Sequence, residues 1–234
     1  MATVLDALTA LAESGLPLSV LEVGAGHGAF TEPLLAAGAE VTASEMSRPS
    51  ISYLEGRYRH NPHFRAVFDP DGSLALLEGQ RFSFVLCSSV LHHIPDYLAF
   101  LHGVTTKHMY AGGTLLSLQD PLWYPTVGRA THRLDRACYL VWRLSRGNYR
   151  VGMQTVSRRL RHQLDENDPS DMVEYHVVRQ GLDQEEIRRR LSESFLEVSV
   201  SPYWSTQAAV LQKIGERMFR PNTFLLLASG RRVP

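Results

Sequence analysis

A glycine-rich segment near the N-terminus is the part of the sequence best suited to bind a small ligand. It runs Glu-Val-Gly-Ala-Gly-His-Gly over residues 22–28 and follows a short apolar run that begins at residue 18. This order predicts a buried strand, a tight turn and then a helix over residues 30–37. Glycines in the turn let a ligand lie against bare backbone, and the start of the helix offers unpaired N–H groups. The segment therefore predicts a ligand cradle.

An acidic residue at the end of the next strand would complete this cradle. Glu45 follows the strand predicted over residues 40–44, and a carboxylate there can accept hydrogen bonds from both hydroxyls of a ribose. Asp69 follows the strand predicted over residues 64–68. The run from Gly24 to Ala29 also satisfies the fingerprint of dinucleotide-binding proteins. The pattern disfavours a bare turn, but it leaves open both NAD and another ribose-containing cofactor.

Residues 22–28 resemble the first motif of the class I S-adenosylmethionine-dependent methyltransferases, in which an acid stands two residues before the first glycine. The resemblance implies that Glu22 helps hold the ammonium group of the cofactor, a group that dinucleotides lack. It also implies that Asp69 meets the adenine amino group and that Phe68 and Met46 flank the adenine ring. The implied cofactor is S-adenosylmethionine, with S-adenosylhomocysteine as product. The implied cofactor contacts are Glu22, Gly24, Ala25, Gly26, Gly28, Glu45, Met46, Phe68, Asp69 and Ser88.

The segment Cys-Ser-Ser-Val-Leu-His-His-Ile-Pro-Asp, residues 87–96, resembles the part of the same family that follows the fourth strand and lines the methionine end of the cofactor. The resemblance implies that His92 and His93 lie near the transferred methyl group. Histidine suits proton removal near neutral pH, so these two are the candidate catalytic residues. The alternative is that the pair caps or packs a turn, while Asp96 caps the following helix. No cluster of side chains has metal-ligand spacing, so we expect no metal cofactor.

Strand and helix patterns alternate through the first half of the chain and predict the scaffold that positions these residues. Apolar strands separated by helices are typical of a parallel sheet covered on both faces. Two further strands, predicted over residues 196–203 and 223–228, indicate an antiparallel hairpin at one sheet edge. The resemblance implies the same architecture: an α/β, Rossmann-like, doubly wound sheet of seven strands in the order 3-2-1-4-5-7-6, with strand 7 antiparallel. Such folds bind ligands at the carboxyl ends of the strands.

The alternating pattern breaks between residues 121 and 180, where no strand is evident and the spacing is helical. We therefore expect a Rossmann-like cofactor-binding core formed by residues 1–120 and 181–234, with residues 121–180 as a helical substrate lid. Large side chains in and near this insertion suit an apolar or planar acceptor, although many of them would simply pack the added helices. The candidate substrate contacts are Trp123, Tyr124, Tyr175, His176 and Trp204.

Composition narrows the classes of partner. The chain has 234 residues, a formal net charge of zero and a pI near 7.2, so neither nucleic acid nor an anionic membrane surface is an expected partner. No apolar run reaches the length of a membrane span, and the start of the chain does not resemble a signal peptide. Two cysteines are too few for a disulfide framework and fit a cytoplasmic location. A homodimer stays open as the state of assembly.

These observations predict an enzyme that transfers a methyl group from S-adenosylmethionine to a small, partly apolar metabolite, in the setting of bacterial secondary metabolism. Oxygen is the expected target, and nitrogen and carbon stay open as alternatives. Two other classes are also alternatives. One is a protein that binds S-adenosylmethionine without methyl transfer, such as a cyclase, and the other is an NAD-dependent oxidoreductase.

Overall fold

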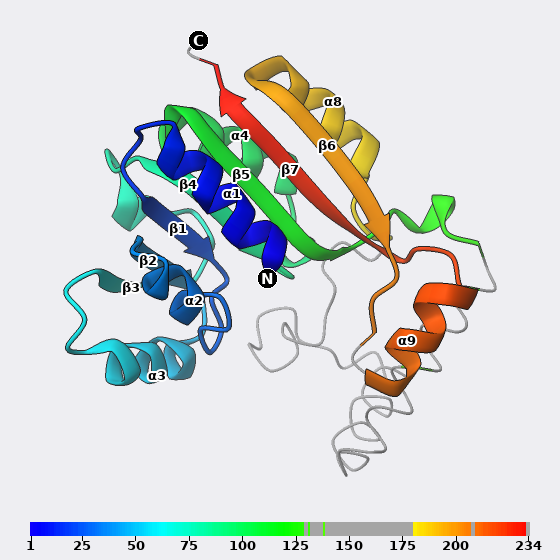
Figure 1. Cartoon of the computed structure of the whole chain (residues 1–234), viewed down its shortest axis with the longest axis horizontal. Helices are drawn as coiled ribbons and strands as arrows, with labels where there is room; N and C mark the ends of the chain where they lie inside the picture. Colours follow the sequence, from blue (N-terminus) through cyan, green and yellow to red (C-terminus); the bar gives the residue numbers. More distant parts are fainter. Residues whose placement is uncertain (129–130, 132–137, 139–179, 207–208, 233–234) are drawn as a thin grey trace.

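The computed structural model describes residues 1–128, 131, 138, 180–206 and 209–232. Its centre is one sheet of seven strands in the order β3-β2-β1-β4-β5-β7-β6 (Figure 1). Neighbouring strands from β3 to β5 pair in parallel, whereas β7 pairs antiparallel with both β5 and β6. The predicted Rossmann-like strand order and the predicted antiparallel pair at one sheet edge are confirmed.

The strands predicted over residues 40–44, 64–68, 196–203 and 223–228 lie within a few residues of the observed bounds. The strands are β1 (Ser19–Val23), β2 (Glu40–Glu45), β3 (Phe64–Phe68), β4 (Phe82–Ser88), β5 (Met109–Pro121), β6 (Phe195–Tyr203) and β7 (Thr223–Arg231). The helices are α1 (Ala2–Glu13), α2 (Thr31–Ala36), α3 (Arg48–Tyr58), α4 (Tyr97–Lys107), α8 (Gln184–Ser194) and α9 (Ala209–Met218). Short 3₁₀ segments are η1 (Ala75–Leu77), η2 (Leu91–His93) and η3 (Tyr124–Thr126).

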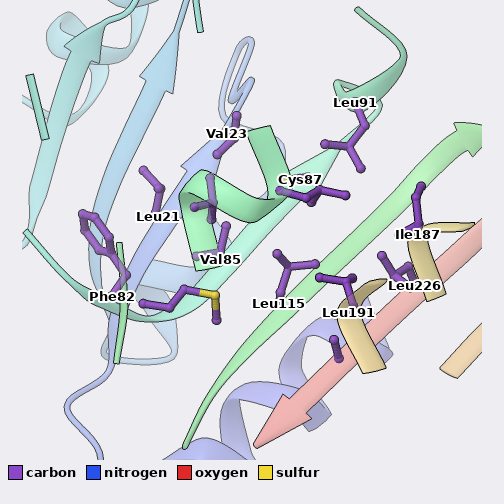
Figure 2. Packing of buried hydrophobic residues seen from close by; sticks show 14 of the residues in the cluster. Leu21, Val23, Phe82, Val85, Cys87, Leu91, Leu115, Ile187, Leu191 and Leu226 are labelled. Carbon is purple, nitrogen blue, oxygen red and sulfur yellow. The ribbon is translucent and has the colours of Figure 1, made fainter. Parts of the chain in front are cut away.

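Helices cover both faces of the sheet, as the apolar strands predict. On one face, α1 and α2 pack against Phe84 and Leu86 of β4. On the opposite face, α4 and α8 form a second apolar layer with Val85 and Cys87 of the same strand, and Figure 2 shows this layer with Ile187 of α8. The four β4 side chains have no exposed surface. Burial of each large apolar side chain contributes roughly 1.5–3 kcal/mol, so the central strands form a rigid base for the loops at their ends.

Aspartate side chains cap two helix starts, one of them at the predicted residue Asp96. The Asp96 carboxylate accepts a hydrogen bond from the N–H of Ala99 at 2.9 Å, at the start of α4. The Asp183 carboxylate accepts one from the N–H of Glu186 at 3.0 Å, at the start of α8. A cap of this kind contributes about 1 kcal/mol to helix stability. The Asp96 cap fixes where α4 begins and therefore limits how far the preceding η2 segment can move.

One element differs from the prediction. The connection between β6 and β7 contains α9, which the sequence did not indicate because Gly215 interrupts the helical pattern. In the structure a Cβ on Gly215 would lie 1.9 Å from the indole nitrogen of Trp204, so glycine is required for this packing. Strand β5, for which the sequence analysis gave no bounds, begins at Met109, and the register of its pairing with β4 shifts at this end.

The predicted insertion at residues 121–180 is described only at its ends. Pro121 still belongs to β5, and Leu122 forms an isolated bridge with Leu182, so the two ends of the insertion lie side by side. Residues 129–130, 132–137 and 139–179 lie outside the described part of the chain, and the helical lid therefore stays a prediction. In the described ranges, no helix combines the length and the apolar character that a membrane crossing requires.

Candidate active site

The glycine-rich segment forms the turn between β1 and α2 at the carboxyl edge of the sheet. Gly24 has a φ of 69°, and a Cβ there would lie 2.7 Å from the Val90 side chain, so a larger residue does not fit. Its N–H donates to the carbonyl of Ser44 at 2.9 Å, which ties the turn to β2. A Cβ on Gly28 would likewise lie 2.9 Å from a side chain of α3. Gly26 differs, because a Cβ there would meet no heavy atom within 4 Å, so its backbone faces open space.

Glu45 ends β2 beside this open backbone. Its Oε2 accepts a hydrogen bond from the N–H of Gly26 at 2.8 Å, and its Oε1 accepts one from the N–H of Ser47 at 2.9 Å. Each carboxylate oxygen can accept two hydrogen bonds, so each oxygen keeps a lone pair for a ligand. Two acceptors at this spacing can bind two hydroxyls on neighbouring carbons, as a ribose presents them.

Asp69 directly follows β3, on the far side of β2 from the glycine turn. Its carboxylate accepts hydrogen bonds from the N–H of Leu74 and from the hydroxyl of Ser44, both at 3.2 Å. Burial raises the pKa of Asp69 above the usual range, and the hydrogen bonds from Leu74 and Ser44 act in the opposite direction. The carboxylate retains capacity for one further donor, such as an amino group.

The residues predicted to contact an adenine ring have different surroundings. Met46 is 39% exposed, so its side chain is accessible to a ligand. The Phe68 ring lies 4.0 Å from the guanidinium of Arg48, measured to the ring centroid, so one face of the ring already contacts a cation. The methyl group of Ala25 is buried in a small apolar cluster that includes Ala43. Ala25 therefore contributes packing beneath the turn rather than a side-chain contact.

Glu22 lies within the sheet, and only 1% of its surface is exposed. Its Oε2 accepts the hydroxyl of Thr31 at 2.6 Å, and the backbone of Phe30 and Thr31 also hydrogen-bonds to the carboxyl. The N–H groups of Phe30 and Thr31 at the start of this helix therefore bond to Glu22, instead of staying unpaired as predicted. The pKa of Glu22 is raised to about 7, chiefly because of burial. The hydrogen bonds from Thr31 and the backbone act in the opposite direction, and the charge of Glu45 contributes a further rise. Contact between Glu22 and a cofactor ammonium stays a prediction.

The raised pKa of Glu22 predicts that the fold loses stability as the pH rises. The pKa of Glu22 is 4.5 in the unfolded chain and about 7 in the folded protein. Between pH 4.5 and about pH 7, the unfolded chain therefore binds fewer protons at Glu22 than the folded protein does. The contribution of Glu22 to the free energy of unfolding is therefore largest below pH 4.5 and declines as the pH rises. The total decline is about 3 kcal/mol once Glu22 is fully ionised in the folded protein. Glu22→Gln should make the free energy of unfolding vary less with pH, measured by urea denaturation at a series of pH values.

Glu55 supplies a matched control for this measurement, because it is an exposed glutamate on α3. Glu55→Gln should keep the wild-type dependence of the free energy of unfolding on pH. If Glu22→Gln kept it as well, Glu22 could not be the buried carboxyl that loses a proton in this range.

The ends of β4 and β5 form a second part of the site. Ser88 ends β4, is half-buried and pairs with Leu118 of β5. Ser89 has a φ of 53°, which is uncommon for a residue with a side chain, and its N–H donates to the carbonyl of Leu118 at 2.8 Å. The chain then enters η2 and brings His92 against β5. Backbone strain of this kind concentrates at functional sites.

His92 and Asp120 form a buried pair at this edge. The Nδ1 atom of His92 lies 2.7 Å from Oδ1 of Asp120, and the two side chains are 5% and 0% exposed. A carboxylate accepts hydrogen bonds, so the proton lies on Nδ1, and Nε2 is then the basic nitrogen of the neutral ring. Asp120 also accepts the His92 N–H at 3.2 Å and the Ser117 hydroxyl at 2.8 Å. These three hydrogen bonds offset the cost of burying the carboxylate.

Sequence reasoning missed Asp120. Side chains alternate along a regular strand, so Asp120 would share a face with Leu118 and point away from Ser117. A bulge at Gln119 reverses this and brings Asp120 to the side of Ser117 and His92. The one available signal was weak, namely an aspartate before a proline at the end of a strand.

The two candidate catalytic histidines have different surroundings. Their rings are neighbours, with centroids 4.1 Å apart. His92 is buried and has the carboxylate of Asp120 as a partner, whereas His93 is half-buried. The contact with Asp120 therefore fixes the ring orientation of His92.

The predicted substrate residues do not all lie together. Trp123 and Tyr124 lie two and three residues beyond the end of β5, at the carboxyl edge, and are half-buried. Trp204 is 3% exposed, and its ring packs against Phe219 with centroids 5.1 Å apart, so it secures α9 to the end of β6. Tyr175 and His176 lie outside the described residues. Among the residues that the structure describes, no group of three or more His, Cys, Asp or Glu side chains could hold a metal ion.

Comparisons with known proteins bear on the family of this chain. Residues 21–115 match a family model described as a methyltransferase domain. The O-antigen chain terminator bifunctional methyltransferase/kinase WbdD of Escherichia coli is 31% identical over 93 residues, which are 38% of this chain. That match spans only 13% of the length of the curated relative.

Two solved structures share the fold along most of the chain. One is an S-adenosylmethionine-dependent methyltransferase from Archaeoglobus fulgidus, 14% identical, with 95% of this chain and 92% of that chain covered and a TM-score of 0.56. The other is the N-methyltransferase NodS from Bradyrhizobium japonicum in complex with S-adenosylhomocysteine, 16% identical, with 100% and 87% covered and a TM-score of 0.54. Residues 21–115 thus match a methyltransferase domain, and the whole sheet has the strand order of the class I S-adenosylmethionine-dependent methyltransferase fold.

Proposed function

We propose that the chain transfers the methyl group of S-adenosylmethionine to a hydroxyl oxygen of a small, partly apolar acceptor. The observation that carries the oxygen assignment is the buried contact between His92 and Asp120 at the carboxyl edge of the sheet. A hydroxyl group must lose its proton when it is methylated, whereas an amine reacts once it is neutral. A fixed base is therefore of most use to an oxygen acceptor.

The carboxyl groups around the glycine turn support S-adenosylmethionine rather than NAD as the cofactor. Glu22, Glu45 and Asp69 lie at the ends of neighbouring strands, and such a set suits hydroxyl, amino and ammonium donors. The pyrophosphate of NAD would be repelled by the same groups. The open space over Gly26 leaves room for a ribose beside Glu45. When bound, the cofactor supplies a methyl group that is attached to a positively charged sulfur, and the sulfur becomes a neutral thioether when the methyl group is transferred.

In the proposed reaction His92 removes the proton of the acceptor hydroxyl through Nε2. Asp120 keeps the other proton on Nδ1, holds the ring in one orientation and stabilises the positive charge that the ring gains. The hydroxyl oxygen forms the new bond to carbon, and its proton remains on His92 until solvent or buffer takes it. General-base catalysis of this kind contributes about a hundred- to ten-thousand-fold to a rate.

The side chains after β5 support an acceptor with an apolar or planar part. Trp123 and Tyr124 stand two and three residues beyond the last residue of β5, at the edge where the His92–Asp120 pair lies. Both are half-buried, so they combine apolar surface with access to a ligand. Aromatic side chains in such positions commonly line small-molecule sites.

The test is a transfer assay with methyl-labelled S-adenosylmethionine and matched pairs of small aromatic acceptors. One member of each pair carries a hydroxyl group, and the other carries an amino group at the same position. We expect labelled methyl ethers from hydroxylated members, identified by mass spectrometry. Label found only on amines would contradict the oxygen assignment, and tight S-adenosylhomocysteine binding without transfer to any acceptor would contradict the methyltransferase activity.

A further inference from the structure

We propose that Tyr203 is a positioning residue for the His92–Asp120 pair, an inference that rests on the proposed role of His92 as base. Tyr203 ends β6, the edge strand of the sheet, and β7 lies between β6 and β5. Its hydroxyl nevertheless reaches β5 and accepts a hydrogen bond from the N–H of Gln119 at 3.0 Å. Gln119 directly precedes Asp120, so this bond acts on the backbone that carries the carboxylate.

Gln119 is an extra residue in β5. Leu118 and Asp120 pair with two consecutive residues of β7, so Gln119 between them forms a β-bulge. Its φ is 64°, in the left-handed region that is unfavourable for a residue with a side chain. The side chain of Gln119 is exposed, so the structure holds this residue through its backbone. The Tyr203 hydroxyl supplies the partner of its N–H in the bulged conformation.

The bulge decides which face of the sheet Asp120 occupies. In an unbroken strand Asp120 would share the face of Leu118, opposite to the face of Ser117. In the structure the Ser117 hydroxyl donates to Asp120 at 2.8 Å, so the two side chains lie on one face. His92 contacts Asp120 from that side at 2.7 Å. The catalytic pair therefore requires the bulge.

Two hydrogen bonds, one from each side of β5, hold the chain where it leaves the regular strand. From β4, the N–H of Ser89 donates to the carbonyl of Leu118 at 2.8 Å. From β6, the hydroxyl of Tyr203 accepts the N–H of Gln119. Without the Tyr203 hydroxyl, Gln119 can relax toward a negative φ. Asp120 then turns away from His92, and the proton on Nδ1 is no longer fixed there.

The first test measures the ring tautomer of His92 in Tyr203→Phe, which keeps the aromatic ring and removes the hydroxyl. Tyr97→Phe is the matched control, because Tyr97 also accepts a backbone N–H, that of Asp183 at 3.3 Å. The readout is ¹⁵N NMR of histidine-labelled protein, with the His92 signals assigned by their loss in His92→Gln. We expect a lower fraction of the Nδ1-protonated tautomer in Tyr203→Phe and the wild-type fraction in Tyr97→Phe.

The second test is kinetic and uses the hydroxylated acceptor that gives most product in the acceptor screen. Tyr203→Phe should lower kcat by about ten- to a hundred-fold, with KM and the Kd of S-adenosylhomocysteine within about two-fold of wild type. Adding Gln119→Gly should restore the tautomer and most of the lost kcat, because glycine adopts a positive φ without strain. A general packing defect would not be restored in this way.

The two tests separate failure of this inference from failure of the proposed function. The NMR measurement needs no acceptor, so an unchanged His92 tautomer in Tyr203→Phe would overturn the positioning role by itself. A kcat equal to that of Tyr97→Phe would overturn it as well. A changed tautomer combined with full activity of His92→Ala would instead overturn the assignment of His92 as the base.

Discussion

His92→Ala should lower kcat by about a hundred- to ten-thousand-fold and leave the affinity for S-adenosylhomocysteine close to that of the wild type. The proposed base is lost, whereas the glycine turn and Glu45 keep their hydrogen bonds. Steady-state kinetics and isothermal titration calorimetry measure the two quantities separately. Removing the His92 ring also leaves the buried Asp120 carboxylate with one hydrogen bond fewer, which costs roughly 1–3 kcal/mol of stability, so the melting temperature must be followed in parallel.

Asp120→Asn gives a second and gentler test of the same pair. It preserves the volume of the side chain, and its amide group can donate to Nδ1 of His92, which favours the tautomer that lacks a basic Nε2. We expect a large loss of kcat with a folded protein that still binds S-adenosylhomocysteine.

His93→Ala is the matched control for His92→Ala, because it removes the neighbouring ring from the same η2 segment. We expect His93→Ala to lower kcat less than ten-fold, an effect below the range of general-base catalysis. A larger loss in His93→Ala than in His92→Ala would transfer the role of base to His93. Full activity in both variants would show that no histidine of this pair acts as the base.

Glu45→Ala should weaken binding of S-adenosylhomocysteine by about ten- to a hundred-fold, which corresponds to roughly 1–3 kcal/mol. The carboxylate offers one free lone pair on each oxygen to a ribose, and it also holds the N–H groups of Gly26 and Ser47. Calorimetric titration with S-adenosylhomocysteine measures the change directly. Glu45→Gln keeps an acceptor at the same position and should cause a smaller loss.

Glu40 provides the control for this titration, because it is an exposed glutamate at the opposite end of the same strand. Glu40→Ala should bind S-adenosylhomocysteine with the wild-type affinity. If Glu45→Ala did so too, Glu45 would have no part in holding the ribose, and the cradle would need another acceptor.

The fold and the cofactor side of the site could be predicted because they depend on local patterns. Apolar strands with polar residues at their ends, and a glycine turn after the first of them, predict a sheet edge on which those polar residues meet. Glu45 and Asp69 lie at neighbouring strand ends for this reason, and Phe68 pairs with Glu45 in the register of β2 and β3. Asp96 was predictable as a cap, since the signal lies within one helical turn.

The contact between His92 and Asp120 could not be predicted from local patterns. Asp120 reaches His92 only through a bulge at Gln119, a residue type that does not favour a positive φ, and the bulge is supported from a strand far away in the sequence. The role of Glu22 as a buried partner of the first turn of α2 also depends on the packing of that turn onto β1. These contacts arise from tertiary structure, which spacing along the chain does not reveal.

The central claim is that the glycine turn and its carboxyl groups bind S-adenosylmethionine, and one titration of the intact chain tests it most directly. The melting temperature is measured with increasing S-adenosylhomocysteine and, separately, with increasing NAD. At about a hundred-fold excess over Kd, S-adenosylhomocysteine should stabilise the fold by about 2.7 kcal/mol and raise the melting temperature by several degrees, while NAD leaves it unchanged. Stabilisation by NAD and not by S-adenosylhomocysteine would contradict the claim.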